Sequence, residues 1–148
     1  MVEGHVITSE SELVHLVQSL GTVAVVGMKD ETEPEAPAYQ IPRMMKLRGI
    51  RVIPVNPKLS RALGEPAYST LAEVPDRFDA VQIFRRPEAV GGIAAEILAL
   101  SPERRPRAVW MQTGIRNEAA ARSLSAAGLL VVMDRCLGVE AAKHRPIS

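Results

Sequence analysis

Short apolar runs recur along the chain, separated by longer segments in which apolar positions follow the helical period. The run at 22–27 (Thr-Val-Ala-Val-Val-Gly) does not alternate with polar residues, which is typical of a parallel strand covered on both faces. Similar runs predict five strands, at 22–27, 51–55, 79–84, 108–111 and 129–133. Residues 56–68 are expected to form a loop, and the strand at 129–133 is the last predicted element.

Helical patterns lie between these runs. Ser9 and Glu12 have the spacing of a capping box, and the apolar residues after them fall on one helical face until Gly21. Further helices are expected at 37–48, 69–74, 88–100 and 117–127. The first of these contains Pro42, which should strain or kink it, and Pro54 should make the second strand irregular near its end.

The order of these elements predicts the fold. Strands that alternate with helices of this length indicate a parallel sheet wound by right-handed crossovers. We therefore expect one domain over residues 1–148, with a doubly wound, Rossmann-like α/β fold in three layers. Ligands of such sheets bind beyond the carboxyl ends of the strands, where the strand order reverses. Five segments should share that edge: 27–30, 56–58, 85–87, 112–115 and 134–136.

The composition narrows the class of protein. The chain has 148 residues and a formal net charge of only +1, so no whole-molecule field draws it to nucleic acid or to a membrane. Its one cysteine, Cys136, excludes an intramolecular disulfide. No apolar run is long enough to span a membrane, and residues 1–12 carry acids where a signal peptide would carry bases. A cytoplasmic protein is expected.

The residues after the second strand indicate the kind of ligand. NAD-binding domains usually carry an acid there, which accepts hydrogen bonds from the hydroxyls of the adenosine ribose. This chain has Asn56, Pro57 and Lys58 instead. A lysine would attract a phosphorylated ribose, whereas a carboxylate would repel it. The position therefore favours coenzyme A or NADP, and the alternative is that Lys58 is a solvated loop residue.

A second group of cations follows the third strand. Phe84 precedes Arg85 and Arg86 at the start of a helix, and cations beside a helix amino terminus form a local anion site. Neighbouring side chains on an extended segment point in opposite directions, so we expect one arginine to face the ligand and the other to form a surface ion pair. Lys29 adds a positive charge, and Gly27 retains only part of a dinucleotide-binding fingerprint.

The other candidates on this edge are polar or small. Asp30 ends the first loop segment, while Gln112 and Gly114 offer an amide and a close backbone approach for a pantetheine arm. Trp110, just before them, is expected in the core. Cys136 is either a reactive thiol or a buried small residue.

No catalytic constellation is visible in the sequence. A P-loop, a nucleophile elbow and paired cysteines are all missing. His5, His15 and His144 lie near the chain ends or in the first helix, without partner residues at a metal-binding spacing. We therefore expect no catalytic and no metal-binding residues, and a role without catalysis is favoured.

Four stretches together resemble the small, stand-alone CoA-binding-domain proteins. They are 49–57 (Gly-Ile-Arg-Val-Ile-Pro-Val-Asn-Pro), 79–87 (ending Phe-Arg-Arg-Pro), 109–114 (Val-Trp-Met-Gln-Thr-Gly) and 131–136 (Val-Val-Met-Asp-Arg-Cys). The resemblance spans residues 8–140. The fold of these proteins is similar to the amino-terminal domain of the succinyl-CoA ligase α-subunit and of ADP-forming acetyl-CoA synthetases. The resemblance implies that coenzyme A is held by the Gly27 loop, the turn at 56–58 and the loop of Arg85 and Arg86, with its adenosine end near the second strand.

The chain departs from that family pattern in the loop after the first strand. Lys29 and Ala38 stand where the family usually has a small residue, often serine, and a serine. The same loop contains four acids, Asp30, Glu31, Glu33 and Glu35. They would oppose a polyanionic ligand unless they point away from it.

Three functions remain open at this point. The first is a non-catalytic carrier, sensor or docking module that binds coenzyme A or an acyl-CoA. The second is an NADP-dependent oxidoreductase or redox sensor on the same fold. In the third, Cys136 forms a mixed disulfide with coenzyme A. Each implies a small-molecule ligand and neither nucleic acid nor membrane, while a homo-oligomer or a protein partner stays open.

Overall fold

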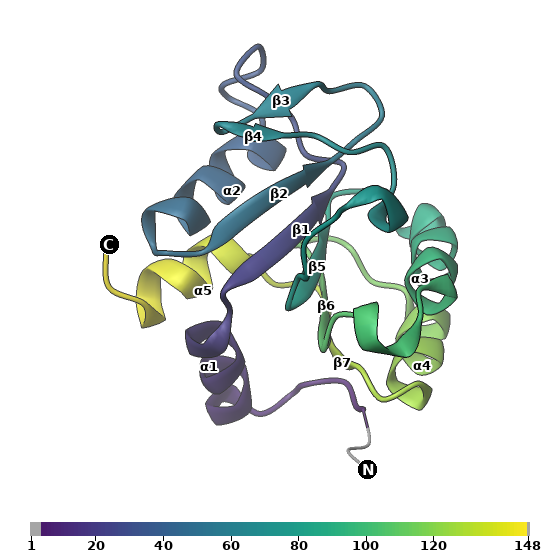
Figure 1. Ribbon diagram of the computed structural model, residues 1–148. Helices are drawn as coiled ribbons and strands as arrows, with labels where there is room; N and C mark the ends of the chain where they lie inside the picture. Colours follow the sequence, from purple (N-terminus) through teal and green to yellow (C-terminus); the bar gives the residue numbers. More distant parts are fainter. Residues whose placement is uncertain (1–3, 148) are drawn as a thin grey trace.

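The computed structural model describes residues 4–147, which form a five-stranded parallel sheet with helices on both faces (Figure 1). The strands are β1 (Thr22–Val26), β2 (Arg51–Val55), β5 (Ala80–Ile83), β6 (Ala108–Met111) and β7 (Leu130–Val132). Their order across the sheet is β2-β1-β5-β6-β7, and each neighbouring pair is parallel. The five predicted strands and the doubly wound, Rossmann-like α/β fold are confirmed.

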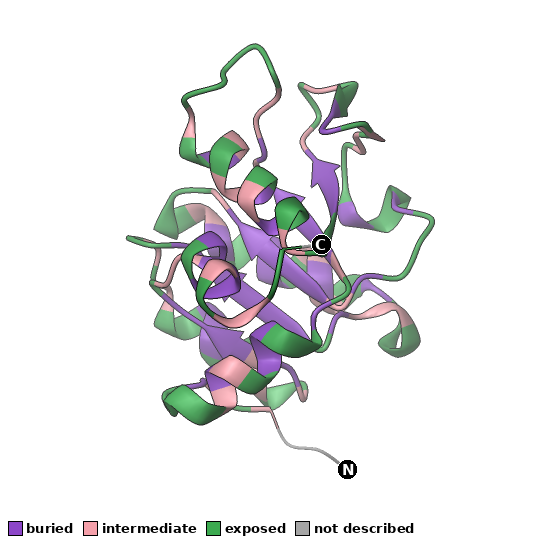
Figure 2. Ribbon diagram, turned by 90° about the vertical axis from the view of Figure 1, so that its left-hand side faces the viewer, coloured by how far each residue is buried: buried purple, intermediate pink, exposed green. Residues whose placement is uncertain are grey.

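The helices form the two outer layers. One face of the sheet is covered by α1 (Glu10–Ser19), α2 (Pro37–Leu47) and α5 (Leu137–His144), and the other by α3 (Val90–Ala99) and α4 (Glu118–Ala126). Figure 2 shows the strands as a buried layer and the outer sides of the helices as exposed. The predicted helix at 69–74 is only a 3₁₀ turn, Leu71–Glu73, and another such turn, Pro87–Ala89, precedes α3.

The sheet divides the core into two apolar clusters. Because side chains alternate along a strand, Val23 and Val25 of β1 pack with α1, α2 and α5. Ala24 and Val26 pack with α3 and α4 on the opposite face. Trp110 is 1% exposed, as expected of a core residue, and its indole N–H donates to a backbone carbonyl 2.8 Å away.

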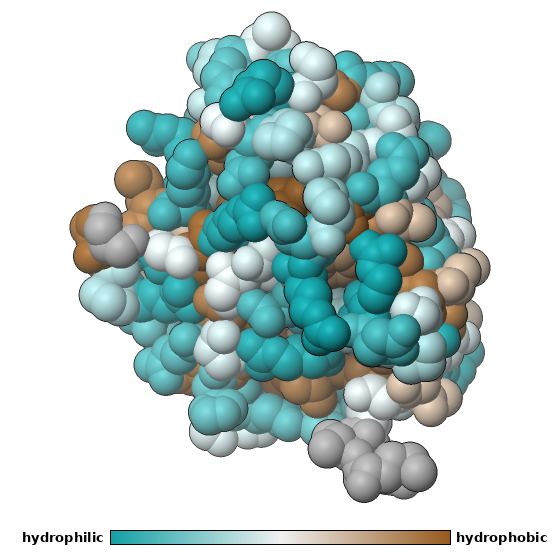
Figure 3. All heavy atoms as spheres, viewed as in Figure 1, coloured by the Kyte–Doolittle hydropathy of each residue, from teal (hydrophilic) through white to brown (hydrophobic). Residues whose placement is uncertain are grey.

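The face of the molecule seen in Figure 3 is mostly hydrophilic, and apolar side chains appear there in small areas between hydrophilic ones. The large apolar side chains exposed among residues 4–147 are Leu47, Val139 and Ile147. Within the same residues, no helix combines the length and the apolar character that a membrane crossing requires.

Pro42 lies inside α2, which continues through it from Pro37 to Leu47. Proline has no amide hydrogen, so the carbonyl oxygen of Ala38, one turn earlier, receives no hydrogen bond from position 42. That oxygen instead accepts from the backbone N–H of Lys29, 3.1 Å away. The carbonyl that Pro42 leaves free in α2 therefore anchors the loop that follows β1.

Pro54 does not make β2 irregular, and that prediction was wrong. It pairs in register with Val25, because β2 lies at the edge of the sheet, where a missing amide hydrogen costs no ladder hydrogen bond. The outer side of Pro54 faces the segment at Tyr68, whose backbone N–H donates to the Pro54 carbonyl (3.0 Å).

A small hairpin was not predicted from the sequence. It consists of β3 (Arg61–Ala62) and β4 (Glu65–Pro66). Its turn residues, Leu63 and Gly64, both have positive φ (49° and 79°). Polar side chains hold this turn: Glu31 accepts from the Leu63 N–H (2.9 Å), and the Lys46 ammonium donates to the Leu63 carbonyl (2.7 Å). The acidic loop is thus tied to the hairpin.

Helix α5 was also not predicted, and the residue after it ties three helices together. The Arg145 guanidinium donates to four backbone carbonyls at 2.8–3.2 Å, those of Val17, Gln18, Leu20 and Arg48. The Arg48 side chain in turn donates to the carbonyls of Ala142 and Arg145. Because these carbonyls lie at or just beyond the carboxyl ends of α1, α2 and α5, the two arginines satisfy groups that a helix end leaves unpaired, Arg145 at α1 and α2 and Arg48 at α5.

Candidate functional site

A cleft opens at the carboxyl ends of β1, β2 and β5. The loop after β1 leads to α2 on one face of the sheet, whereas the loop after β5 leads to α3 on the other, so the two loops diverge. The cleft has a volume of ≈ 430 Å³. It is lined by Gly27, Lys29, Asn56, Pro57, Lys58, Phe84, Arg85 and Arg86, all of them candidates from the sequence.

Gly27 allows the first loop to lie close to the second. Its φ is +83°, a left-handed conformation that favours glycine. A Cβ atom at this position would overlap the carbonyl oxygen of Phe84 and lie 3.0 Å from Cδ of Arg85. The backbone of Gly27 is therefore packed directly beneath the start of the arginine loop.

Asn56 fixes the geometry of the cleft from the β2 side. Its amide nitrogen donates to the Met28 carbonyl (2.9 Å), and its oxygen accepts from the backbone N–H of Lys58 (2.9 Å). One side chain therefore joins the Gly27 loop to the turn at 56–58. We infer that Asn56 positions the loops, since both ends of its amide are already engaged.

Four cationic side chains line the cleft, and two of them have acidic partners. Lys29 lies 3.6 Å from Glu33, and Arg86 lies 3.7 Å from Glu88. Both are exposed ion pairs, which contribute little to stability and are readily exchanged. Lys58 and Arg85 form no ion pair within 4.0 Å with any residue in the described range 4–147. The cleft therefore has a positive charge that nearby residues do not neutralise.

The sequence suggested that only one of the two arginines would face the ligand, but both line the cleft. Arg85 extends over Gly27, while Arg86 is largely exposed and pairs with Glu88. The expected surface ion pair is present at Arg86. It does not remove that side chain from the cleft, because β5 ends at Ile83 and the backbone bends at Arg85 instead of staying extended.

Three of the four acids in the loop after β1 (Asp30, Glu31 and Glu33) contact other protein groups. Asp30 accepts hydrogen bonds from the hydroxyl and the amide of Thr32, and the side-chain bond contributes most to lowering the pKa of Asp30. Glu31 holds the hairpin turn, and Glu33 pairs with Lys29. Asp30 is not among the residues that line the cleft. The four acids do not form a negative lining against the proposed ligand site.

Gln112 and Gly114 lie elsewhere on the edge and do not line the cleft. Gln112 is 3% exposed, and its oxygen accepts from the Gln82 amide (3.0 Å) and from the first amide of α5, at Leu137 (3.2 Å). Gly114 donates its N–H to Asp134 (2.6 Å). These contacts join the loops after β6 and β7.

Cys136 is a free, half-buried thiol at the residue before α5. It follows β7, which is the outermost strand on the side away from β2. It does not line the cleft.

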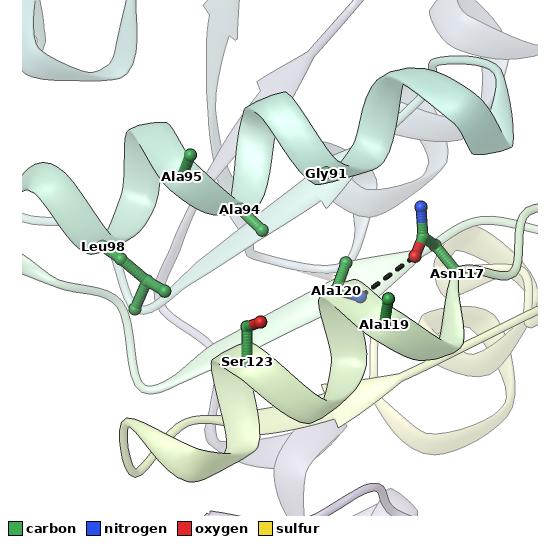
Figure 4. A pocket seen from close by; sticks show the side chains of 8 residues that line it. All are labelled: Gly91, Ala94, Ala95, Leu98, Asn117, Ala119, Ala120 and Ser123. Carbon is green, nitrogen blue, oxygen red and sulfur yellow. Dashed lines mark hydrogen bonds between the residues drawn. The ribbon is translucent and has the colours of Figure 1, made fainter.

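A second hollow, of ≈ 320 Å³, lies between α3 and α4 and was not predicted from the sequence (Figure 4). Small residues such as Gly91, Ala95 and Ala119 line it. Asn117 borders it as the cap of α4, its side-chain oxygen accepting from the Ala120 N–H (3.0 Å). It has no charged lining residue, in contrast to the basic cleft at the carboxyl ends of β1, β2 and β5.

The fold and the basic cleft define a Rossmann-like α/β domain with a crevice lined by cationic side chains where its strand order reverses. More specifically, the chain belongs to the CoA binding domain family, whose model matches residues 21–142. This membership supports binding of coenzyme A in general.

Similar proteins have nearly the same length as this chain. The Bacillus subtilis protein YneT is 36% identical over 131 residues, which is 88% of this chain and 93% of YneT. A Thermus thermophilus structure is 34% identical with a TM-score of 0.82, covering 93% of this chain and 99% of that one. A hypothetical protein from Pyrococcus horikoshii is 25% identical with a TM-score of 0.83, covering 97% of this chain and 98% of that one.

A larger protein contains the same fold. The dinucleotide-forming acetyl-coenzyme A synthetase 1 of Ca. Korarchaeum cryptofilum is 21% identical to this chain, with a TM-score of 0.62. The match covers 80% of this chain and 27% of that one. At this identity the likeness concerns the fold alone.

Proposed function

We propose that this protein binds coenzyme A, or an acyl-CoA, in the cleft formed by the Gly27 loop, the turn at 56–58 and the loop of Arg85 and Arg86. The observation that carries the proposal is the combination of four cations with the lack of a carboxylate at the end of β2. The phosphates of coenzyme A carry about 3.5 to 4 negative charges at neutral pH, reasoning from the acidities of phosphate esters. The cleft offers a matching set of positive charges.

The cleft suggests an orientation for the ligand. Lys58, after β2, would bind the 3′-phosphate on the ribose, where NAD-binding proteins use an acid for the ribose hydroxyls. Arg85, which extends over Gly27, would bind the diphosphate. Lys29 would exchange Glu33 for a phosphate oxygen when the ligand binds, because its present ion pair is exposed.

We further propose a role as a carrier, sensor or docking module without catalysis. The residues that line the cleft include neither a histidine, nor a cysteine, nor a carboxylate that could act as nucleophile or general base. Their side chains are suited to holding anions, and Asn56 is engaged in holding the loops together.

Calorimetric titration with coenzyme A, dephospho-coenzyme A and NADPH at fixed salt would test the proposal. We expect coenzyme A to bind more tightly than dephospho-coenzyme A, which lacks the 3′-phosphate, and NADPH not to bind. Binding of NADPH without coenzyme A would favour an NADP-dependent function on the same fold. Binding of neither ligand would refute the cleft as a nucleotide site.

Variants at the cleft would test the proposed orientation. Lys58→Ala and Arg85→Ala should each weaken coenzyme A binding by about 1.5–3 kcal/mol, the range for hydrogen bonds to charged groups. Lys58→Ala should also remove the preference for coenzyme A over dephospho-coenzyme A. Arg122→Ala, an exposed arginine on α4, is the matched control and should leave the affinity unchanged. Unchanged affinity in both cleft variants would refute the proposed positions of the phosphates.

A further inference from the structure

Glu140 of α5 is a buried carboxylate whose two oxygens have different surroundings. Its side chain is only 5% exposed. Oε2 lies 3.4 Å from the Arg135 guanidinium and 3.9 Å from the Lys143 ammonium. Oε1 is buried and has no hydrogen-bond partner among residues 4–147. Because a buried polar atom without a partner is unfavourable, the Oε1 atom indicates a binding position that the surrounding side chains leave open.

Two other potential metal-ligand atoms lie beside Oε1. His144 follows Glu140 by four residues, so both are on the same side of α5, and its Nε2 lies 3.5 Å from Oε1. This nitrogen is also buried without a hydrogen-bond partner in the described part of the chain. Glu10, at the start of α1, contributes a carboxylate oxygen. One ligand atom from each of the three residues lies within 4.8 Å of the others.

We propose that Glu10, Glu140 and His144 form a binding site for a divalent transition metal ion. An imidazole combined with two carboxylates suits Zn²⁺, whereas Ca²⁺ and Mg²⁺ take oxygen ligands. Zinc bonds of about 2.0–2.2 Å require the ligand atoms to approach one another. Glu10 can supply that movement, because its side chain is exposed and lies in the first turn of its helix.

The neighbouring cations are compatible with a metal ion. Arg135 also contacts Glu10 (3.0 Å), but this ion pair is exposed and therefore weak. If Glu10 turns to the metal, Arg135 keeps its contact with Oε2 of Glu140 and orients that carboxylate from outside the coordination sphere. With His144 neutral, the two carboxylates balance Arg135 and Lys143, so the site carries no net positive charge before the metal binds.

The proposed ion would join α1 to α5. The three residues lie outside the set that lines the basic cleft, so the metal site stands apart from coenzyme A binding. Its effect should appear as stability: a metal that binds only the folded chain raises the unfolding temperature. For a chain of this size we expect a rise of ~5–10 °C when free Zn²⁺ is about a hundred times its Kd.

Titration of the full chain with ZnCl₂, followed by calorimetry and by thermal unfolding, would test this proposal. We expect one Zn²⁺ per chain, weaker binding in acid because the imidazole must be neutral, and a loss of about tenfold or more in affinity in both Glu10→Gln and His144→Ala. Glu10 is exposed, so its variant should fold normally even if His144→Ala does not. His5→Ala removes a different imidazole, which contacts Glu12, and should bind Zn²⁺ like the wild type.

The proposal is overturned if the wild type binds no Zn²⁺, or if Glu10→Gln binds Zn²⁺ as tightly as the wild type. Loss of binding in His5→Ala would overturn it as well, since the metal would then lie at the amino-terminal histidine. The absorption spectrum of the Co²⁺ complex is a second readout, and it should change in Glu10→Gln and remain the same in His5→Ala.

Discussion

Replacing Gly27 with alanine perturbs the centre of the proposed coenzyme A site in two separable ways. The backbone has a φ of +83°, which disfavours any residue with a side chain. In addition, the new methyl group would overlap the carbonyl oxygen of Phe84 and press against Arg85 Cδ. Because the overlapped oxygen of Phe84 belongs to the backbone, a change of side-chain rotamer cannot relieve the overlap. The backbone just after β5 would have to move instead.

The two effects can be given magnitudes. The left-handed conformation costs an alanine about 1–2 kcal/mol, and overpacking typically costs a further 1–3 kcal/mol. Gly27→Ala should therefore destabilise the fold by ~2–5 kcal/mol. Gly114→Ala is a matched control, because Gly114 has nearly the same φ, +82°, while an added Cβ would meet no atom within 4 Å. It should show only the conformational cost.

Urea unfolding of both variants measures the difference, which should be about 1–3 kcal/mol in favour of Gly114→Ala. Coenzyme A titration should show weaker binding by Gly27→Ala and unchanged binding by Gly114→Ala, because Gly114 does not line the cleft. Equal stabilities would mean that the close approach to Phe84 is not retained in solution. The explanation for glycine at this position would then be wrong.

Three more substitutions have defined outcomes. Arg145→Met leaves carbonyls at the ends of α1 and α2 without their donor and should lower the free energy of unfolding by about 2–4 kcal/mol in urea; a loss below about 1 kcal/mol would contradict this role. Glu33→Gln frees Lys29 and should tighten coenzyme A binding by up to about fivefold at low salt and less at high salt, whereas weaker binding would argue against a phosphate at Lys29. Cys136→Ser should leave the affinity for coenzyme A unchanged in calorimetry, because the thiol does not line the cleft, and a marked loss would revive the thiol-based hypothesis.

The parallel sheet could be predicted because its strands are short, mainly apolar runs such as 22–26 and 108–111, buried on both faces. The candidate cleft followed from the same pattern. Residues just after β1, β2 and β5 must meet at one edge, whatever their side chains do. The sequence alone did not show which of the five segments at this edge of the sheet line the same cleft. Gln112 and Gly114 follow β6, and hydrogen bonds direct them towards the β7 loop.

Other features depend on tertiary contacts that a local pattern does not contain. Helix α5 has eight residues, includes Gly138 and lacks a side-chain cap, so its stability comes from packing on α1 and α2. Unless residues 137–144 are known to be helical, the four-residue spacing of Glu140 and His144 does not indicate that the two side chains lie on the same side of one helix. The hairpin was missed because its turn places Leu63, which is not a typical turn residue, at positive φ.

Pro42 has a consequence for how the chain could be engineered. Alanine at this position would restore a donor to the middle of α2 and would be favoured by helix propensity. The new amide would, however, compete with Lys29 for the carbonyl oxygen of Ala38. A more regular helix would thus loosen the loop that lines the proposed coenzyme A cleft. In this fold the proline leaves a helix carbonyl free to bind the neighbouring loop. A screen that selects variants for stability alone, without measuring ligand binding, would therefore select against Pro42.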